Sequence, residues 1–251
     1  MIKQIYGNTL SRVPQCVRSL IPQSLSGRIL CVATFAFGAV AFYYASKSYR
    51  LNQFKLELDR WVKQEGEKSS LAAKEILDCY ENGNKTLSLD GLQLKTLPAC
   101  LGLLTSLNQL YVSGNHVSGN QLESLPDSIG ELKALTKLNV FSNKLKSLPE
   151  SMGGLKALTE LNVSSNLLKS LPDWIGELKA LTVLGVFGNQ LESLPDSIGG
   201  LKALTELDVS CNKLKSLPDS ISELKALREL DVSGNKLKSL PDRIGELKAL
   251  R

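Results

Sequence analysis

Residues 194–216 read LPDSIGGLKALTELDVSCNKLKS, and the chain repeats this stretch with small changes along most of its length. The Leu-Pro pair recurs at residues 97, 125, 148, 171, 194, 217 and 240, so the first interval is 28 residues and every later one is 23. A fixed period of this size is typical of solenoids, in which each repeat is one turn that packs only on its neighbours. The repeat therefore predicts a solenoid over residues 87–251.

Each repeat has an extended part and a short helical part. Leu207 and Val209 alternate with polar residues, which predicts a short strand with two side chains pointing inward. Pro218 lacks an N–H and has a fixed φ, which favours the first position of a short helical turn with Ile221 and Leu224 pointing inward. An asparagine follows each strand, and its amide can satisfy backbone groups that would otherwise be buried unpaired. We call this column the ladder: Asn143, Asn166, Asn189, Asn212 and Asn235.

The pattern LTELDVSCNKLKSLP of residues 204–218 resembles a leucine-rich repeat, and the resemblance covers about residues 87–251. The period is similar to that of plant intracellular Ras-group-related repeat proteins. The entry segment, residues 72–98, is similar to the start of secreted leucine-rich-repeat effectors of Gram-negative pathogens, some of which carry a ubiquitin-ligase domain. The resemblance implies an α/β solenoid with short parallel strands on a concave face, short helical or 3-10 segments on a convex face, and helices before it. It also implies that the concave face binds proteins.

The N-terminal part of the chain differs from the repeat in charge and hydropathy. Of the formal net charge of +5, residues 1–56 carry +7, so the remainder is at −2 and offers no basic field to nucleic acid. Residues 29–45, ILCVATFAFGAVAFYYA, contain no charge and follow a basic segment, residues 1–28. We expect a single transmembrane helix there, with basic residues on both sides leaving its orientation open. The alternatives are a cleaved secretory signal ending near Ala39-Val40-Ala41, an organelle transit peptide and a buried globular helix.

The pattern of residues 46–86 predicts a helical linker and an N-terminal cap for the repeats. Trp61 belongs to an apolar spacing of three to four residues and is expected in the core. Ser69 and Ser70 are candidate caps of a second helix, which stops at Asn82-Gly83. We expect this second helix to pack on the first turn of the repeat.

Three places depart from the regular repeat. Leu92 stands at the ladder position of the first turn, as expected for an atypical terminal turn. Residues 112–120, VSGNHVSGN, duplicate five residues, so either Asn115 or Asn120 can fill the ladder. We expect Asn115 in the ladder and the extra residues in a loop on the rim. At the other end, residues 244–251 stop midway through a turn, and this last turn is expected to expose leucines and a strand edge.

The outward strand positions form the predicted concave surface and supply the candidates for partner binding. Three aromatic residues, Tyr111, Phe141 and Phe187, are expected to lie in one column. Aromatic side chains on a polar sheet bury a large area at low entropic cost, so they favour an apolar contact. Four acidic residues in the last two turns favour a basic partner: Glu206, Asp208, Glu229 and Asp231.

Other outward positions are weaker candidates. Trp174 replaces the serine found at this position in most turns and is expected to be partly exposed, as a lesser contact residue. A lysine also recurs on the convex side, often two residues after a glutamate, which predicts a solvated face. These convex lysines are Lys133, Lys156, Lys179, Lys202, Lys225 and Lys248.

The sequence holds no recognisable pattern of catalytic or metal-binding residues. His116 is its one histidine, the five cysteines lack metal-ligand spacing, and neither a phosphate-binding glycine loop nor a nucleophile elbow occurs. Cys211, at the exit of a strand, is expected to be a packing residue. We therefore predict a non-catalytic protein–protein interaction module without a cofactor, anchored in a membrane and, on the resemblance, a bacterial effector. The alternatives are the substrate-recognition arm of a ubiquitin ligase that lacks its catalytic domain, and a secreted protein.

Overall fold

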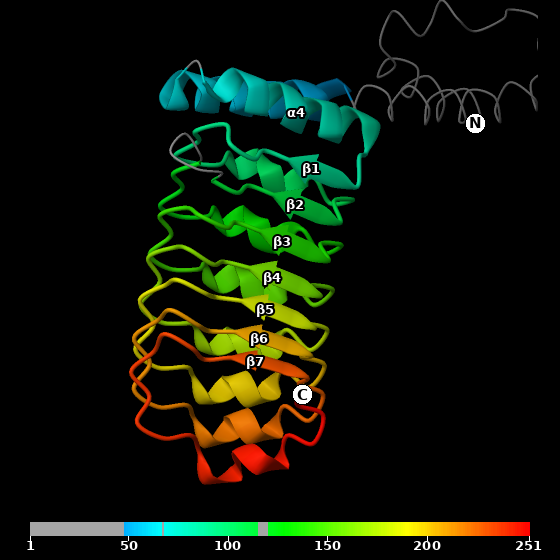
Figure 1. The fold of residues 1–251 in the computed structure, drawn as a ribbon. Coiled ribbons are helices and arrows are strands. Elements are labelled where there is room, and N and C mark those ends of the chain that lie inside the picture. The colour runs from blue at the N-terminus through cyan, green and yellow to red at the C-terminus, as the bar shows by residue number, and fades with distance from the viewer. Residues whose placement is uncertain (1–47, 67, 115–119) are drawn as a thin grey trace, which may run out of the picture. The chain divides into compact units, whose positions relative to one another are not determined.

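The computed structural model describes residues 48–66, 68–114 and 120–251 (Figure 1). The chain divides into two compact units, Met1–Lys55 and Leu56–Arg251. The basic segment 1–28 and the predicted transmembrane helix 29–45 lie outside the described residues. Within the described ranges, no helix combines the length and the apolar character that a membrane crossing requires.

Helices precede the repeats. Residues 48–55 of the first unit are helical, and the second unit begins with helical residues 56–65 and then α4, Ser69–Asn82. Gly83 ends α4 in the left-handed conformation, at φ 65, and its N–H donates to the Cys79 carbonyl oxygen, as the Asn-Gly pair predicts. The predicted serine cap is wrong, because Ser69 already lies in the first turn of α4. Its hydroxyl donates instead to the Gly66 carbonyl oxygen at 2.6 Å.

The helices of the second unit cap the first turn of the solenoid, and α4 lies beside β1 (Figure 1). Trp61 is 6% exposed, and its Nε1 donates to Thr96 Oγ1 at 2.9 Å. That hydroxyl in turn donates to Glu65 Oε2 at 2.7 Å. The prediction that Trp61 is a core residue is therefore confirmed, and its polar atom is satisfied within the cap.

Seven strands form one parallel sheet in which the order of the strands follows the chain (Figure 1). Equivalent residues of successive turns pair, so that Leu161 lies opposite Leu184. The central leucine of each strand points inward and its neighbours point outward. The strands are β1 (Thr86–Ser88), β2 (Gln109–Tyr111), β3 (Lys137–Asn139), β4 (Glu160–Asn162), β5 (Val183–Gly185), β6 (Glu206–Asp208) and β7 (Glu229–Asp231).

Each turn closes through a short 3-10 helix on the convex side. A proline precedes each helix in an extended conformation, for example Pro218 at φ −69 and ψ 150, so it lies just before the helix and not in its first position as predicted. These helices are η2 (Ala99–Leu103), η4 (Asp127–Glu131), η5 (Glu150–Gly154), η6 (Asp173–Glu177), η7 (Asp196–Gly200), η8 (Asp219–Glu223) and η9 (Asp242–Glu246).

Leucines from every turn form one continuous core. Leu207, Val209, Ile221 and Leu224 are all fully buried, as the inward positions predicted. A single turn has no second layer to bury these side chains, so burial comes from stacking at about 4.8 Å per turn. The predicted α/β solenoid is confirmed.

The asparagine ladder joins each turn to the one before it. Asn166 Oδ1 accepts the backbone N–H of Leu145 at 2.9 Å. Its Nδ2 donates to the carbonyl oxygens of Val163 at 2.9 Å and Val140 at 3.1 Å. One buried amide thus satisfies polar groups of two turns, and Asn143, Asn189 and Asn212 repeat the arrangement.

Asn120, and not Asn115, fills the ladder at the duplication. Asn120 is 4% exposed, and its Oδ1 accepts the backbone N–H of Leu94 at 2.9 Å. Its Nδ2 donates to the Leu89 carbonyl oxygen at 2.7 Å. The expectation for Asn115 was wrong because a ladder asparagine stands two residues before an inward leucine, and Leu122 gives that spacing to Asn120 alone. Residues 115–119, which include most of the predicted rim loop, lie outside the described residues.

Candidate protein-binding surface

The concave face carries three columns of outward side chains. The first and third residues of each strand form two columns, and the residue two positions after each strand forms the third. Tyr111 pairs with Asn139 and lies in the second column, whereas Phe141 and Phe187 lie in the third. The prediction that the three aromatics share one column is therefore wrong, because Tyr111 ends a strand and each phenylalanine lies beyond one.

Phe141 and Phe187 are two turns apart, with the turn of Ser164 between them. Both phenylalanines are half-buried, so their rings are partly packed and still available to a partner. The turn spacing of about 4.8 Å separates their backbones by roughly 10 Å. Tyr111 is also half-buried, and its hydroxyl donates to Gln109 Oε1 at 3.1 Å along its own strand. The two phenylalanines are thus the pair that an apolar segment of a partner can reach together.

Between the two ends of the sheet, β5 presents an uncharged strip. Its outward residues are Val183 and Gly185, and Phe187 follows. A Cβ at Gly185 would lie 3.1 Å from Ser164 Oγ and 3.2 Å from Asn162 Oδ1, so the side chains of the preceding turn crowd this position and favour glycine. Sequence reasoning missed this contact, although the signal was present: glycine stands where neighbouring turns have asparagine or aspartate.

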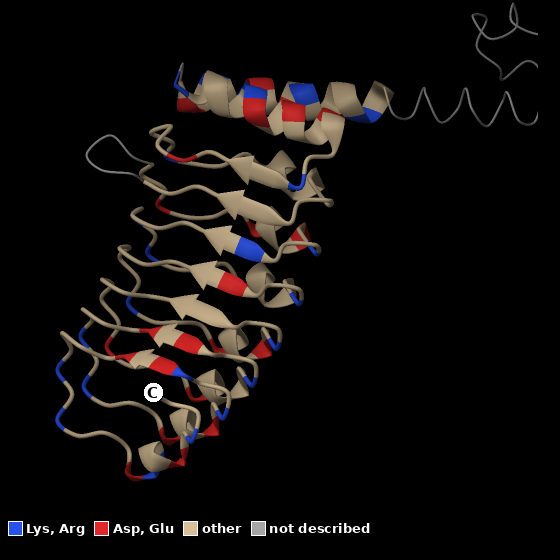
Figure 2. Ribbon diagram, turned by 45° about the vertical axis from the view of Figure 1, so that its right-hand side comes forward, with Lys and Arg blue, Asp and Glu red and all other residues tan. Residues whose placement is uncertain are grey.

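Four carboxylates occupy the last two strands. Register places Glu206 opposite Glu229 and Asp208 opposite Asp231. None of the four forms an ion pair within the described part of the chain, whereas Lys137 on β3 pairs with Glu160 on β4 at 2.7 Å. Figure 2 shows this change along the sheet, with one basic and one acidic strand, an uncharged strand and then two acidic strands. The last two strands therefore present a net negative surface.

An aspartate on each acidic strand accepts hydrogen bonds from a serine of its own turn. The backbone N–H of Ser233 donates to Asp231 Oδ1 at 2.8 Å, and this bond lowers the pKa of the Asp231 carboxyl. Asp208 Oδ1 accepts the backbone N–H and the hydroxyl of Ser210, at 3.0 and 2.6 Å. Like charges opposite one another on neighbouring strands cost stability. Retaining them unpaired is consistent with a basic partner that neutralises them.

Trp174 does not belong to the surface. It is 5% exposed and lies in η6, against the preceding turn. A Cβ at Gly153 would come within 3.0 Å of Trp174 Cβ, so the glycine makes room for the larger side chain. The prediction of partial exposure was wrong because the neighbouring convex helices pack closely and cover this side chain.

Three of the convex lysines form exposed ion pairs between turns. Lys156 pairs with Glu177 at 2.8 Å, and Lys202 pairs with Glu223 at 2.7 Å. Such exposed pairs contribute little to stability and are compatible with the solvated face that was predicted.

The cysteines of the described residues differ in environment. Burial raises the pKa of the Cys100 thiol to about 12, so this thiol stays protonated. Cys211 is exposed at φ 51, and its assignment as a packing residue was wrong. The left-handed backbone at this position places Cys211 outside the core.

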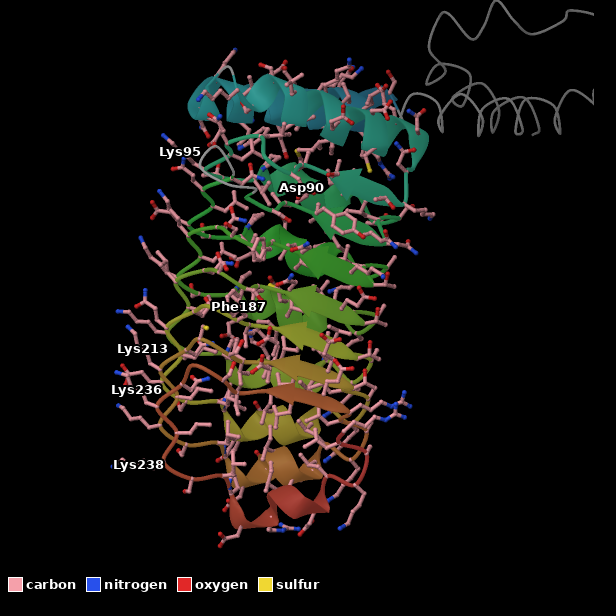
Figure 3. The ribbon with its side chains drawn as sticks, viewed as in Figure 1. Asp90, Lys95, Phe187, Lys213, Lys236 and Lys238 are labelled. Atoms are coloured by element: carbon pink, nitrogen blue, oxygen red, sulfur yellow. The ribbon has the colours of Figure 1, made fainter. Side chains whose placement is uncertain are left out.

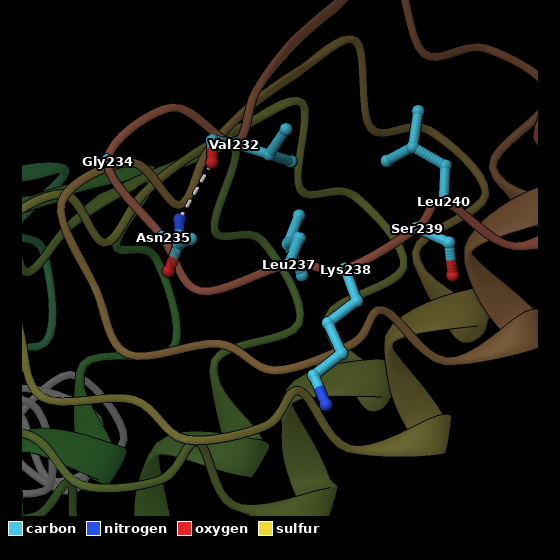
Figure 4. A pocket seen from close by; sticks show the side chains of 7 residues that line it. All are labelled: Val232, Gly234, Asn235, Leu237, Lys238, Ser239 and Leu240. Atoms are coloured by element: carbon cyan, nitrogen blue, oxygen red, sulfur yellow. Dashed lines mark hydrogen bonds between the residues drawn. The ribbon is translucent and has the colours of Figure 1, made fainter.

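A shallow hollow of about 330 Å³ lies in the last turn (Figure 4). Its lining includes Val232, Leu237 and Leu240, and Asn235 Nδ2 donates to the Val232 carbonyl oxygen at 2.9 Å. Elsewhere in the solenoid the equivalent face is covered by the next turn. The hollow thus lies on a surface of the kind that the other turns bury by stacking.

Comparison with known proteins agrees with this architecture. The family model described as leucine rich repeat matches residues 142–191 and 181–237, and no curated protein matches the chain. Among solved structures, an LRR protein from Leptospira interrogans is 34% identical with a TM-score of 0.59. The crystal structure of PEPR1–AtPEP1 is 29% identical with a TM-score of 0.56. Both similarities cover 62% of this chain, which spans 38% of the Leptospira chain and 22% of the other.

Proposed function

We propose that this chain, whose repeats match the leucine-rich-repeat family over residues 142–237, is a non-catalytic module that binds a protein partner on its concave face. The observation that carries the proposal is the ordered chemistry of that face. An uncharged strip, formed by β5 and the half-buried Phe187 that follows it, adjoins four unpaired carboxylates on β6 and β7. A partner segment that crosses these strands would place an apolar residue over β5 and basic residues over the last two strands.

The apolar half of the contact centres on Phe187 and the uncharged outward residues of β5, Val183 and Gly185. A half-buried ring is already held in place, so a partner gains contact area without ordering a free side chain. Val183 adds an apolar side chain in the same turn, and Phe141 extends the column of Phe187 two turns away. Central aromatic anchors of this kind supply much of the affinity of protein interfaces.

The acidic half sets the choice of partner and the rate of association. Unpaired carboxylates at Glu206, Asp208, Glu229 and Asp231 attract a basic segment and repel an acidic one. The crystal structure of PEPR1–AtPEP1, to which this chain is similar, holds two molecules together, and this supports binding of a partner by a solenoid of this type.

We expect the double substitution Phe141→Ala and Phe187→Ala to weaken partner binding roughly a hundredfold, because truncating each half-buried aromatic anchor costs about 1.4 kcal/mol, which is tenfold in affinity. Charge reversal by Asp208→Lys and Asp231→Lys should slow association and abolish its salt dependence. Proximity labelling with the intact protein identifies the partners, and their affinities are then measured with purified proteins. If the chain acts as an effector, those partners come from a host-cell lysate.

The matched control is the pair Asp196→Lys and Asp219→Lys. These aspartates are also one repeat apart and exposed, but they lie on the convex side. The control should retain every partner that the concave variants lose. Equal capture by the concave variants, the control and the unaltered protein would rule out the concave face as the binding surface.

Residues 29–45 support a second element of the proposal, an anchor in a membrane, because the run is apolar throughout and flanked by basic residues. We expect the intact protein to stay in the membrane pellet after carbonate extraction, and protease protection of the repeats then gives their side of the membrane. Complete release by carbonate would refute the anchor and leave the concave-face proposal untouched.

A further inference from the structure

Eight lysines line one lateral edge of the solenoid, at the positions one and three residues after the ladder. We call this surface the lysine edge. Two glutamates, Glu123 and Glu192, share the same positions, so eight lysines against two glutamates give the edge a net charge of +6. The lysines are Lys95, Lys144, Lys146, Lys169, Lys213, Lys215, Lys236 and Lys238, and all of them are exposed.

Backbone hydrogen bonds between turns hold these positions in a straight array. The N–H of Lys213 donates to the Leu191 carbonyl oxygen and the N–H of Lys236 to the Leu214 carbonyl oxygen, both at 2.9 Å. The spacing along the edge is therefore the turn spacing, about 4.8 Å. Figure 3 shows Lys95, Lys213, Lys236 and Lys238 projecting from the same edge. The charges form a rigid line and not a flexible tail.

Most of this charge is not neutralised within the protein. Lys146 pairs with Glu123 at 2.7 Å and Lys215 with Glu192 at 3.0 Å. Lys169, Lys213, Lys236 and Lys238 have no ion pair among the described residues. The convex lysines behave differently, since three of them pair with a glutamate of the next turn. Positive charge left unpaired along one edge favours an external anion.

The composition of the edge indicates the kind of anion. Every basic residue on it is lysine, a point charge without the planar fork by which arginine recognises single carboxylates or phosphates in fixed geometry. Leu167, 38% exposed, stands in the same column as Lys144 and Lys213, and Leu240, 48% exposed, follows Lys238 by two residues. Lysines interspersed with exposed leucines are typical of surfaces that rest on a bilayer.

We propose that the lysine edge lies against the headgroups of an anionic lipid bilayer. A nucleic-acid duplex fits the edge less well, because the edge has neither arginine nor an aromatic residue to contact bases. The charge outside the edge also disfavours a large polyanion. Residues 57–251 carry a net charge of −2, and the edge contributes +6, so the other residues in this range carry −8. A flat bilayer would contact only the lysine edge. The acidic concave face would then remain exposed to solvent and to its partner.

The test compares the full chain on phosphatidylcholine vesicles with and without phosphatidylserine, so that the apolar run 29–45 contributes to both. We expect the unaltered chain to prefer anionic vesicles and to lose that preference at high salt. Each lysine near an anionic surface increases the affinity about fivefold. The preference of the variant K213Q/K236Q/K238Q for anionic vesicles should therefore be roughly a hundredfold weaker. Amine acetylation read by mass spectrometry should find these three lysines protected on anionic vesicles only.

The control variant K156Q/K202Q/K225Q removes the same charge from the convex side and should keep most of the preference for anionic vesicles. A third arm measures binding of a DNA duplex by fluorescence anisotropy. The proposal is overturned if both variants lose the preference equally, if acetylation of the edge is unchanged by anionic lipid, or if the duplex binds more tightly than the vesicles.

Discussion

The substitution Gly176→Ala should destabilise the solenoid by about 3 kcal/mol, because neighbouring turns have no room for a methyl group there. An ideal Cβ at Gly176 would lie 2.1 Å from the carbonyl oxygen of Ser197 in the next turn. That oxygen belongs to the backbone, so relief requires the two turns to separate. Separation would loosen the buried leucines on both sides. Urea unfolding of the intact chain, followed by circular dichroism, gives the change in the free energy of unfolding.

Gly245 is the matched control, because it holds the equivalent position in the last 3-10 helix and nothing lies within 4 Å of its ideal Cβ. Gly245→Ala should change the free energy of unfolding by no more than about 0.5 kcal/mol. Equal effects at Gly176 and Gly245 would show that close stacking of the convex helices does not limit this position.

The substitution Asn166→Ala should cost about 2 to 3 kcal/mol by removing the amide that joins two turns. It leaves the N–H of Leu145 without its side-chain acceptor. The carbonyl oxygens of Val140 and Val163 each lose one of two amide donors and keep the other, from Asn143 and Asn189. A buried N–H left unpaired costs about 1–3 kcal/mol. Hydrogen exchange should localise the effect, with faster exchange at Leu145 than at amides three turns away.

Asn235 provides the comparison within the same ladder. It makes equivalent bonds, with Oδ1 accepting the Leu214 N–H at 3.0 Å and Nδ2 donating to Val209 at 2.9 Å, but it is only partly buried. Asn235→Ala should cost about 1 kcal/mol, because water can hydrogen-bond to the backbone groups that lose the Asn235 side chain. A loss at Asn235 as large as that at Asn166 would mean that burial does not govern the contribution of the ladder.

The fold could be predicted from the sequence because the same pattern of residues occurs seven times. Inward leucines, outward polar residues and the proline before each convex helix recur at fixed spacing, so any one turn can be checked against the others. At the duplication in residues 112–120 the prediction of Asn115 was wrong, although the spacing of ladder asparagines to the next leucine favoured Asn120. A comparison of this turn with the others identifies Asn120 from the sequence.

The candidate site was less accessible, because its character depends on contacts between turns. The sequence identified Phe141, Phe187 and the four acidic residues as outward, but it could not show that Lys137 neutralises Glu160 while those acids stay unpaired. Nor could it show that Trp174 is buried, since the space for its ring comes from Gly153 in another turn.

By itself, then, the sequence determined the period, the inward side chains and the strand and convex segments, since these follow from local spacing and hydropathy within one turn. Only the tertiary structure decided which charges pair, which aromatics share a column and which edge keeps a line of free lysines. These properties arise between residues about one repeat apart, at distances set by how closely the turns stack.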